Sequence, residues 1–156
     1  MDHQHRYALD LEWTGNQGTG TDGYRSYRRD HVVRVAGKPD LLGSSDPTFR
    51  GDPSRHNPED LLLAALSACH MLSYLHACVA EGVIVTAYRD RATGTMRTFP
   101  DNGGRFEEVT LHPEVTVKDA SMIVKANTLH AIANKWCFIA NSVNFPVHHE
   151  PMIIVG

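Results

Sequence analysis

Residues 57–80 read NPEDLLLAALSACHMLSYLHACVA, and this stretch predicts the central element of the fold. Asn57 is a favourable helix N-cap, and Pro58 suits the first helical position. The two acidic residues that follow place negative charge in the first turn, where it favours a helix. Gly82 is a natural stop. We therefore expect a helix of about 24 residues, roughly 36 Å long at 1.5 Å per residue.

After its first turn this helix carries no charge and has apolar residues on every face. Such a helix is either buried all round or spans a bilayer, since the uncharged run reaches about 20 residues. Ser67, His70, Ser73 and His76 lie inside the run and disfavour the bilayer. We expect a central helix wrapped by sheets, with a partner subunit as one source of the covering strands.

The segment before the helix alternates in polarity as short strands do. Residues 7–13 read as a half-buried strand and residues 24–35 as a second strand or hairpin partner. Between them, residues 15–23 are rich in glycine and form a turn or flexible loop. A second loop, rich in Gly, Pro, Ser and Asp, covers residues 43–56.

The segment after the helix predicts two long strands, a second helix and a last strand. Residues 83–98 and 106–117 are joined through Asp-Asn-Gly-Gly at 101–104, a strong hairpin signal. Residues 121–136 have apolar side chains at helical spacing. Residues 147–155 form a strand that Pro151 places at an edge. The order predicts an α+β fold in a single domain, residues 1–156.

Composition removes several classes of function. Charged residues make up 21% of the 156 and hydrophobic ones 42%, as in ordinary globular proteins. The formal charge of −3 gives no basic surplus for nucleic acid. No apolar stretch follows a basic segment at the N-terminus, so we expect no signal or transit peptide and a cytoplasmic location. Thiols stay mostly reduced there, so the three cysteines are core thiols or redox-active ones.

The cysteines are the first candidates for chemistry. Cys69 and Cys78 lie on opposite faces of one helix, about 13 Å apart along its axis, too far for a disulfide. Cys78 therefore reads as a core residue. Cys137 follows the second helix and can face Cys69 if the two helices pack together. The spacing alone leaves open that all three cysteines only fill the core.

Ten histidines raise the question of a metal site. The chain has no H-x-x-x-H, H-E-x-x-H or C-x-x-C spacing, and His148 and His149 diverge on a strand. His70 and His76 lie six apart on different faces of a helix. We expect no bound metal, and treat a site made of these two histidines and a cysteine as a weaker alternative.

Residues 57–69 resemble the N-P-E-x-L-x-x-A-x-x-x-A-C signature of the OsmC/Ohr family of thiol-dependent peroxidases. Residues 13–15 and 18–21, Trp-Thr-Gly and Gly-Thr-Gly-Thr, look like the opening hairpin of that family. Cys137 falls where the second cysteine of the family lies, between the second helix and the last strand. The resemblance covers most of the chain.

The resemblance implies a fold and a reaction. The fold would be antiparallel sheets wrapped around two central helices in an intertwined homodimer, with active sites at the subunit interface. The chain would be an antioxidant enzyme of the stress response that reduces organic, and in the OsmC branch inorganic, hydroperoxides. Cys69 would attack the peroxide and become a sulfenic acid, and Cys137 would resolve it as a disulfide. An external dithiol, such as a lipoylated protein, would restore the thiols without a bound cofactor.

The resemblance also implies an arginine that Glu59 orients to stabilise the Cys69 thiolate. Arg50 best fits the position of this arginine in the OsmC branch, and Arg25 the position in the Ohr branch. Arg55 is a third option. His70 stands where the family commonly has Phe, and no proline follows Cys137, which indicates an OsmC-like subgroup. A non-catalytic protein that binds a small apolar molecule on the same fold is the alternative function.

Overall fold

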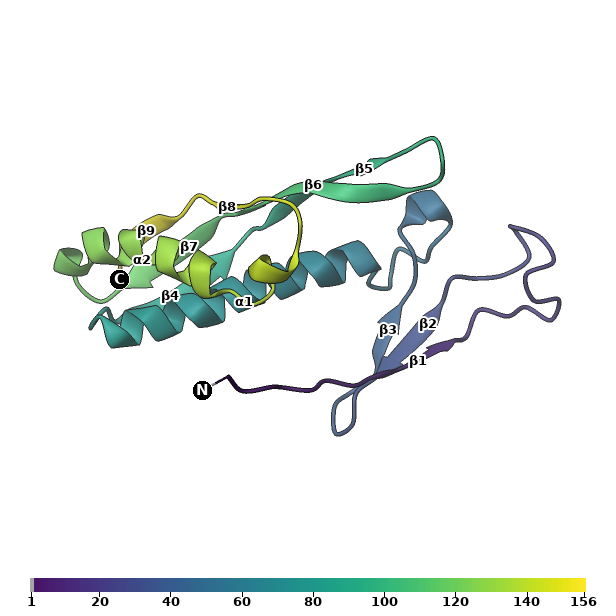
Figure 1. Ribbon diagram of the computed structural model, residues 1–156, viewed down its shortest axis with the longest axis horizontal. Helices are drawn as coiled ribbons and strands as arrows, with labels where there is room; N and C mark the ends of the chain where they lie inside the picture. Colours follow the sequence, from purple (N-terminus) through teal and green to yellow (C-terminus); the bar gives the residue numbers. More distant parts are fainter. Residues whose placement is uncertain (1) are drawn as a thin grey trace. The chain divides into compact units, whose positions relative to one another are not determined.

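The structure, a computed structural model, describes residues 2–156 (Figure 1). These residues group into two compact units, which divide between Leu61 and Leu62. The prediction of a single domain over residues 1–156 stays a prediction. As predicted, the chain combines helices and sheets in an α+β fold.

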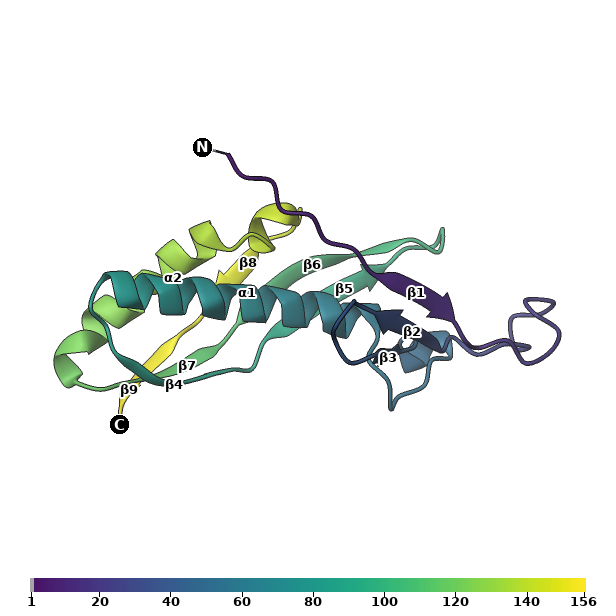
Figure 2. The ribbon, with the colours of Figure 1, turned by 90° about the horizontal axis from the view of Figure 1, so that it is seen from below.

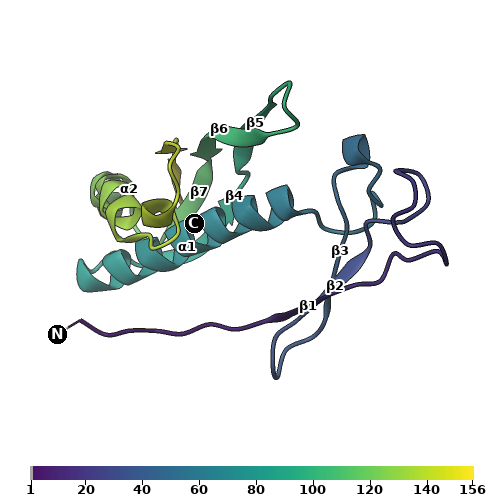
Figure 3. The ribbon, with the colours of Figure 1, turned by 45° about the vertical axis from the view of Figure 1, so that its right-hand side comes forward.

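The first unit contains a small antiparallel sheet. Its strands are β1 (Asp10–Trp13), β2 (His31–Arg34) and β3 (Leu41–Gly43), in the order β1-β2-β3 (Figure 3). A short 3-10 helix, η1 (Pro47–Phe49), follows. The predicted strand 7–13 is confirmed only from Asp10 onward, and its expected half-burial is wrong, because all four residues of β1 are exposed. Strand β3 was not predicted.

The predicted strand 24–35 is wrong over its first half. Residues 24–30 form turns and a loop, and β2 begins only at His31. The guanidinium of Arg29 causes this loop to curl, because it donates to the carbonyl oxygens of Tyr27 at 2.7 Å and Tyr24 at 2.8 Å. It also lies over both tyrosine rings, at 4.1 and 4.5 Å from their centroids.

The predicted central helix is confirmed as α1 (Pro58–Ala80). Asn57 caps it: its side-chain oxygen accepts from the N–H of Asp60 at 2.8 Å, and the Asp60 carboxylate accepts from the N–H of Asn57. This reciprocal pair satisfies two backbone donors at the helix start. By length and composition α1 also suits a membrane span, which for a single helix is weak evidence.

Only one face of α1 is buried in the described chain. The buried residues are Leu66, His70, Tyr74, Ala77 and Cys78. On other faces Leu72 is 63% exposed and Val79 is 80% exposed. Within a single chain, the prediction that α1 is buried on every face is therefore wrong.

The second unit contains two three-stranded sheets in matching order. One is β4 (Val85–Asp90), β7 (Pro113–Val117) and β9 (Met152–Val155), in the order β4-β7-β9. The other is β5 (Thr93–Thr98), β6 (Gly104–Leu111) and β8 (Val147–His149), in the order β5-β6-β8. The pairs β6–β8 and β7–β9 are parallel, so these sheets are mixed rather than purely antiparallel.

Each long strand predicted for this unit is divided in two at the same level. The divisions fall at 91–92, at His112 and at 150–151. Asp90 links the first two divisions, because one oxygen of its carboxylate accepts the N–H of His112 at 2.7 Å. The N–H of Glu150 donates to the carbonyl of Leu111 at 2.8 Å. The predicted hairpin at 101–104 joins β5 to β6, and the predicted edge position of the last strand is confirmed for β8 and β9.

The second predicted helix is confirmed as α2 (Ile123–Trp136), preceded by the 3-10 turn η2 (Ala120–Met122). Both helices lie on the same face of the strands (Figure 2). A hydrophobic core lies between the two helices and the strands. In it Tyr74 of α1 and Leu129 of α2 pack in one cluster with Val115 of β7. A smaller cluster around Leu66, Val109 and Leu111 continues toward the N-terminal half of α1.

Candidate functional site

The structure brings together the two cysteines that the sequence singled out. Cys69 lies mid-way along α1 and is partly exposed, whereas Cys137 directly follows α2 and is 1% exposed. The two thiols are neighbours, close enough for Cys69 to raise the pKa of Cys137. Cys137 Sγ also accepts the N–H of Ala140 at 3.4 Å. Residues 68 positions apart in the chain thus form one thiol pair.

The environment of Cys137 favours its protonated form. The pKa of the Cys137 thiol is raised to about 11, mainly by burial and also by the neighbouring Cys69, while the backbone N–H groups of Ala140 and Ile139 act in the opposite direction. At neutral pH Cys137 therefore keeps its proton. A protonated Cys137 can donate a hydrogen bond to the sulfur of Cys69, and such donation stabilises a negative charge there.

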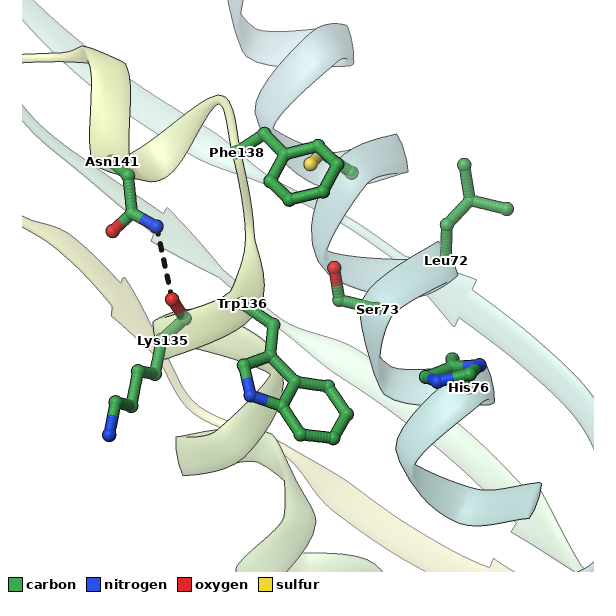
Figure 4. Close-up of a pocket in the computed structure, with 8 residues that line it drawn as sticks. Leu72, Ser73, His76, Lys135, Trp136, Phe138 and Asn141 are labelled. Carbon is green, nitrogen blue, oxygen red and sulfur yellow. Dashed lines mark hydrogen bonds between the residues drawn. The ribbon is translucent and has the colours of Figure 1, made fainter. Parts of the chain in front are cut away.

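A mostly apolar cavity of about 620 Å³ opens beside Cys69 (Figure 4). The ring of Trp136 faces α1 and lies 5.8 Å from the ring of His76. Phe138 covers another part of the wall and is 79% exposed. The cavity is lined by Cys69, Leu72, Ser73, His76, Lys135, Trp136, Phe138 and Asn141.

The polar residues Asn141 and Lys135 contribute to the cavity wall in different ways. The amide of Asn141 donates to the carbonyl oxygen of Lys135 at 3.0 Å, which ties the turn after Cys137 back onto α2. The ammonium of Lys135 points away from the cavity in Figure 4. An apolar molecule with one reactive polar group would fit this cavity, since such sites combine apolar walls with a few polar atoms.

Three histidines form a cluster beside Cys69, with His70 and His130 buried and His149 partly buried, and the sequence reasoning missed it. His70 Nε2 and His130 Nδ1 are 3.0 Å apart, and the ring of His149 lies 5.7 and 6.0 Å from theirs. Burial lowers the pKa of His70 to about 4 and that of His130 to about 3. The His149 pKa is lowered by burial too. No spacing in the sequence could have shown that these three residues of different elements meet.

The predicted arginines lie in the first unit. Arg50 is exposed, with a left-handed φ of 65°, and lines a polar cavity with Arg28, Asp30 and Asp52. Arg55 is partly buried; its Nε lies 4.0 Å from Asp30 and 3.8 Å from Asp52. The ion pair with buried Asp30 therefore holds the guanidinium of Arg55 more firmly than that of exposed Arg50 is held.

Arg25 and Glu59 complete the predicted set. Arg25 is exposed on the loop before β2. Glu59 is partly buried in the first turn of α1. Ten residues separate it from Cys69, roughly 15 Å of helix rise. The roles assigned to Glu59 and to each arginine stay predictions.

Cys78 lies in the core beside Tyr74, where burial raises its pKa. Its place fits the expected core role. Among residues 2–156 no group of three His, Cys, Asp or Glu side chains is arranged to hold a metal ion.

Comparisons with known proteins point to one family. Residues 51–151 match the family described as OsmC-like protein. Among solved structures, an OsmC-like protein of unknown function from Vibrio cholerae is 28% identical. Its TM-score is 0.83, and the alignment covers 96% of this chain and 100% of that one. A search of curated proteins found no match.

Two more distant structures share the fold. One, from Legionella pneumophila, is described as an organic hydroperoxide resistance protein OsmC and is 18% identical, with a TM-score of 0.69 over 97% of this chain and 99% of that one. The other, from Elizabethkingia anophelis, is described as an organic hydroperoxide resistance protein and is 17% identical, with a TM-score of 0.68 over 99% and 100%.

Proposed function

The chain belongs to the OsmC-like family, and from this premise we propose that it is a thiol-dependent peroxidase for organic hydroperoxides. One observation supports the proposal above all others: a buried thiol, Cys137, is a close neighbour of Cys69, which lines a mostly apolar cavity. That combination offers a nucleophile, a second thiol to react with its oxidised form, and room for an apolar substrate.

The reaction follows from these two sulfurs. The Cys69 thiolate attacks one oxygen of the peroxide, the O–O bond breaks, and the departing alkoxide takes a proton to become an alcohol. Cys69 is then a sulfenic acid. Cys137 loses its proton and attacks the Cys69 sulfur, so that a disulfide forms and water leaves. An external dithiol, for which a lipoylated protein is our candidate, reduces the disulfide by thiol exchange.

A guanidinium would stabilise the Cys69 thiolate, because burial otherwise opposes charge on sulfur. We assign this role to Arg50, held by Glu59, with Arg55 and Arg25 as alternatives. Replacing each arginine in turn with alanine and timing the loss of the Cys69 thiol tests the assignment. A slower reaction for Arg55→Ala alone would transfer the role to Arg55, which Asp30 already holds.

A homodimer accounts for the apolar surface that one chain leaves uncovered. Leu72, Val79 and Phe138 are each more than 60% exposed around the helices. A second copy would cover them by hydrophobic burial. We propose a cytoplasmic homodimer that binds neither nucleic acid nor membrane. A single-chain mass of 17.3 kDa by light scattering would contradict the dimer.

The alternative function is binding without catalysis, and the size of the cavity favours it as second candidate. A binding protein of this kind would hold an apolar small molecule beside an unreactive Cys69. The two functions differ in what happens to the thiols when a peroxide is added.

Intact mass after one equivalent of cumene hydroperoxide tests the proposal. We expect the chain to lose two hydrogens, with Cys69 and Cys137 protected from alkylation. Cys69→Ser should abolish consumption of the hydroperoxide. An unchanged mass, with both thiols still open to alkylation, would leave only the binding function.

A further inference from the structure

Helices α1 and α2 are joined by one buried hydrogen bond between side chains. His70 Nε2 and His130 Nδ1 lie 3.0 Å apart, and their ring planes differ by only 6°. The shared N–H therefore lies in the plane of both rings, which is the favourable direction for an imidazole nitrogen. His70 is 1% exposed and His130 is fully buried, so water does not compete for the bond.

A second contact beside this bond joins the same two helices. The ring of Tyr74 stacks on His130 with centroids 3.9 Å apart. Its hydroxyl donates to the carbonyl oxygen of Ala126 at 3.0 Å. Residues one turn apart on α1 thus contact residues one turn apart on α2, and the contacts run in opposite directions along the two helices.

This antiparallel register leads to the thiols. Cys69 immediately precedes His70, and Cys137 follows His130 by seven residues, about two helical turns. Because the helices are antiparallel here, the N-terminal direction along α1 and the C-terminal direction along α2 coincide. Cys69 and Cys137 therefore lie on the same side of the histidine pair. A shift of one helix along the other at His70 and His130 would therefore also move Cys137 relative to Cys69.

We propose that the His70–His130 hydrogen bond is a positioning device that holds α2 against α1 in the register that pairs Cys137 with Cys69. The inference deepens the proposed function, since a resolving thiol must reach the oxidised one. Both histidines are positioning residues rather than catalytic ones.

A directional bond does this better than apolar packing. Apolar side chains tolerate small shifts of one helix along another, whereas a buried N–H···N pair is lost by such a shift and leaves unpaired polar atoms. The groups facing the pair are His149 of β8, Asp90 of β4 and Tyr74 of α1. With the pKa of both imidazoles well below neutral, the pair keeps one shared proton at pH 7.

The test is the equilibrium between the two thiols and glutathione, in which the dithiol and glutathione disulfide give the protein disulfide and two glutathione thiols. His130→Leu removes the bond, whereas His130→Asn keeps an amide atom near the Nδ1 position. All proteins carry Cys78→Ser, and His148→Asn serves as the control because His148 is exposed and outside the buried pair. The ratio of glutathione species at half oxidation is read at pH 7 by alkylation and intact mass.

We expect His130→Leu to lower the equilibrium constant for disulfide formation at least tenfold, with His130→Asn and His148→Asn within threefold of the parent. Equal constants for the Leu and Asn variants would overturn the proposal, as would a parent that forms no disulfide at any ratio. If His130→Leu does not fold, His70→Leu against His70→Gln repeats the comparison from α1. No peroxide takes part, so a parent that forms the disulfide but ignores peroxide contradicts the proposed function alone.

Discussion

Single residues decide the chemistry at Cys137. Its thiol combines near-complete burial with a contact to a second thiol, and both raise its pKa. The backbone N–H groups of Ala140 and Ile139 act to lower it. The thiol pair is therefore asymmetric, with one sulfur buried and protonated and the other partly exposed beside a cavity.

This asymmetry predicts the pH profile of alkylation at Cys137. The variant Cys78→Ser removes the third thiol, and the alkylation rate at Cys137 is followed in it from pH 7 to 11 by peptide mass. Because only the thiolate reacts, the rate should keep rising up to about pH 11, the pKa to which burial raises this thiol. A plateau near the pKa of 9.0 of an ordinary thiol would show that Cys137 is not shielded as described.

At the scale of elements, α1 needs a defined beginning because it carries Cys69 and His70. Asn57 and Asp60 provide that beginning by capping each other's backbone N–H groups. Beyond this first turn, burial of the apolar side chains on one face stabilises the helix within the chain.

Replacing Asn57 with alanine tests this cap. The change removes the acceptor of the Asp60 N–H and should lower the free energy of unfolding by about 1 kcal/mol. Asn57→Asp keeps an acceptor oxygen and should lower it by less. Urea unfolding followed by circular dichroism measures both, and equal losses for the two variants would rule out a capping role.

At the scale of the whole molecule, folding keeps several histidines neutral. Burial sets the pKa of His70 near 4 and that of His130 near 3, below the ordinary value of 6.5. Between these values and 6.5 the unfolded chain binds more protons than the folded one. Stability is therefore full above about pH 6.5 and falls as the pH drops toward 4.

This linkage predicts an acid-sensitive fold. The free energy of unfolding should fall by about 5 kcal/mol between pH 7 and pH 4.5, since His70 and His130 each contribute over about two pH units at about 1.4 kcal/mol per unit. His130→Asn should show a shallower fall, and the exposed His148→Asn the same fall as the parent. Urea unfolding at each pH measures the slope; a flat profile down to pH 4.5 would mean that the histidines are not buried in the neutral form.

Local patterns predicted much of the architecture. The cap at Asn57, the apolar run behind it and the Asp-Asn-Gly-Gly turn at 101–104 act through neighbours in sequence, so α1 and the β5–β6 hairpin were expected correctly. Residues 24–30 were misjudged because the Arg29 guanidinium curls a segment whose composition suits a strand. The division of the long strands was not expected, since Asp90 and His112, which a hydrogen bond joins at two of the divisions, are 22 residues apart.

The sequence by itself determined the α+β class, the central helix and the candidacy of Cys69 and Cys137, because these depend on residue type, local spacing and a short signature. Only the tertiary structure decided that the two sulfurs meet, that Trp136 and Phe138 line the cavity beside them, and that His70 pairs with His130. These contacts join residues of different elements, and the register between two packed helices is set by side chains that no local periodicity relates.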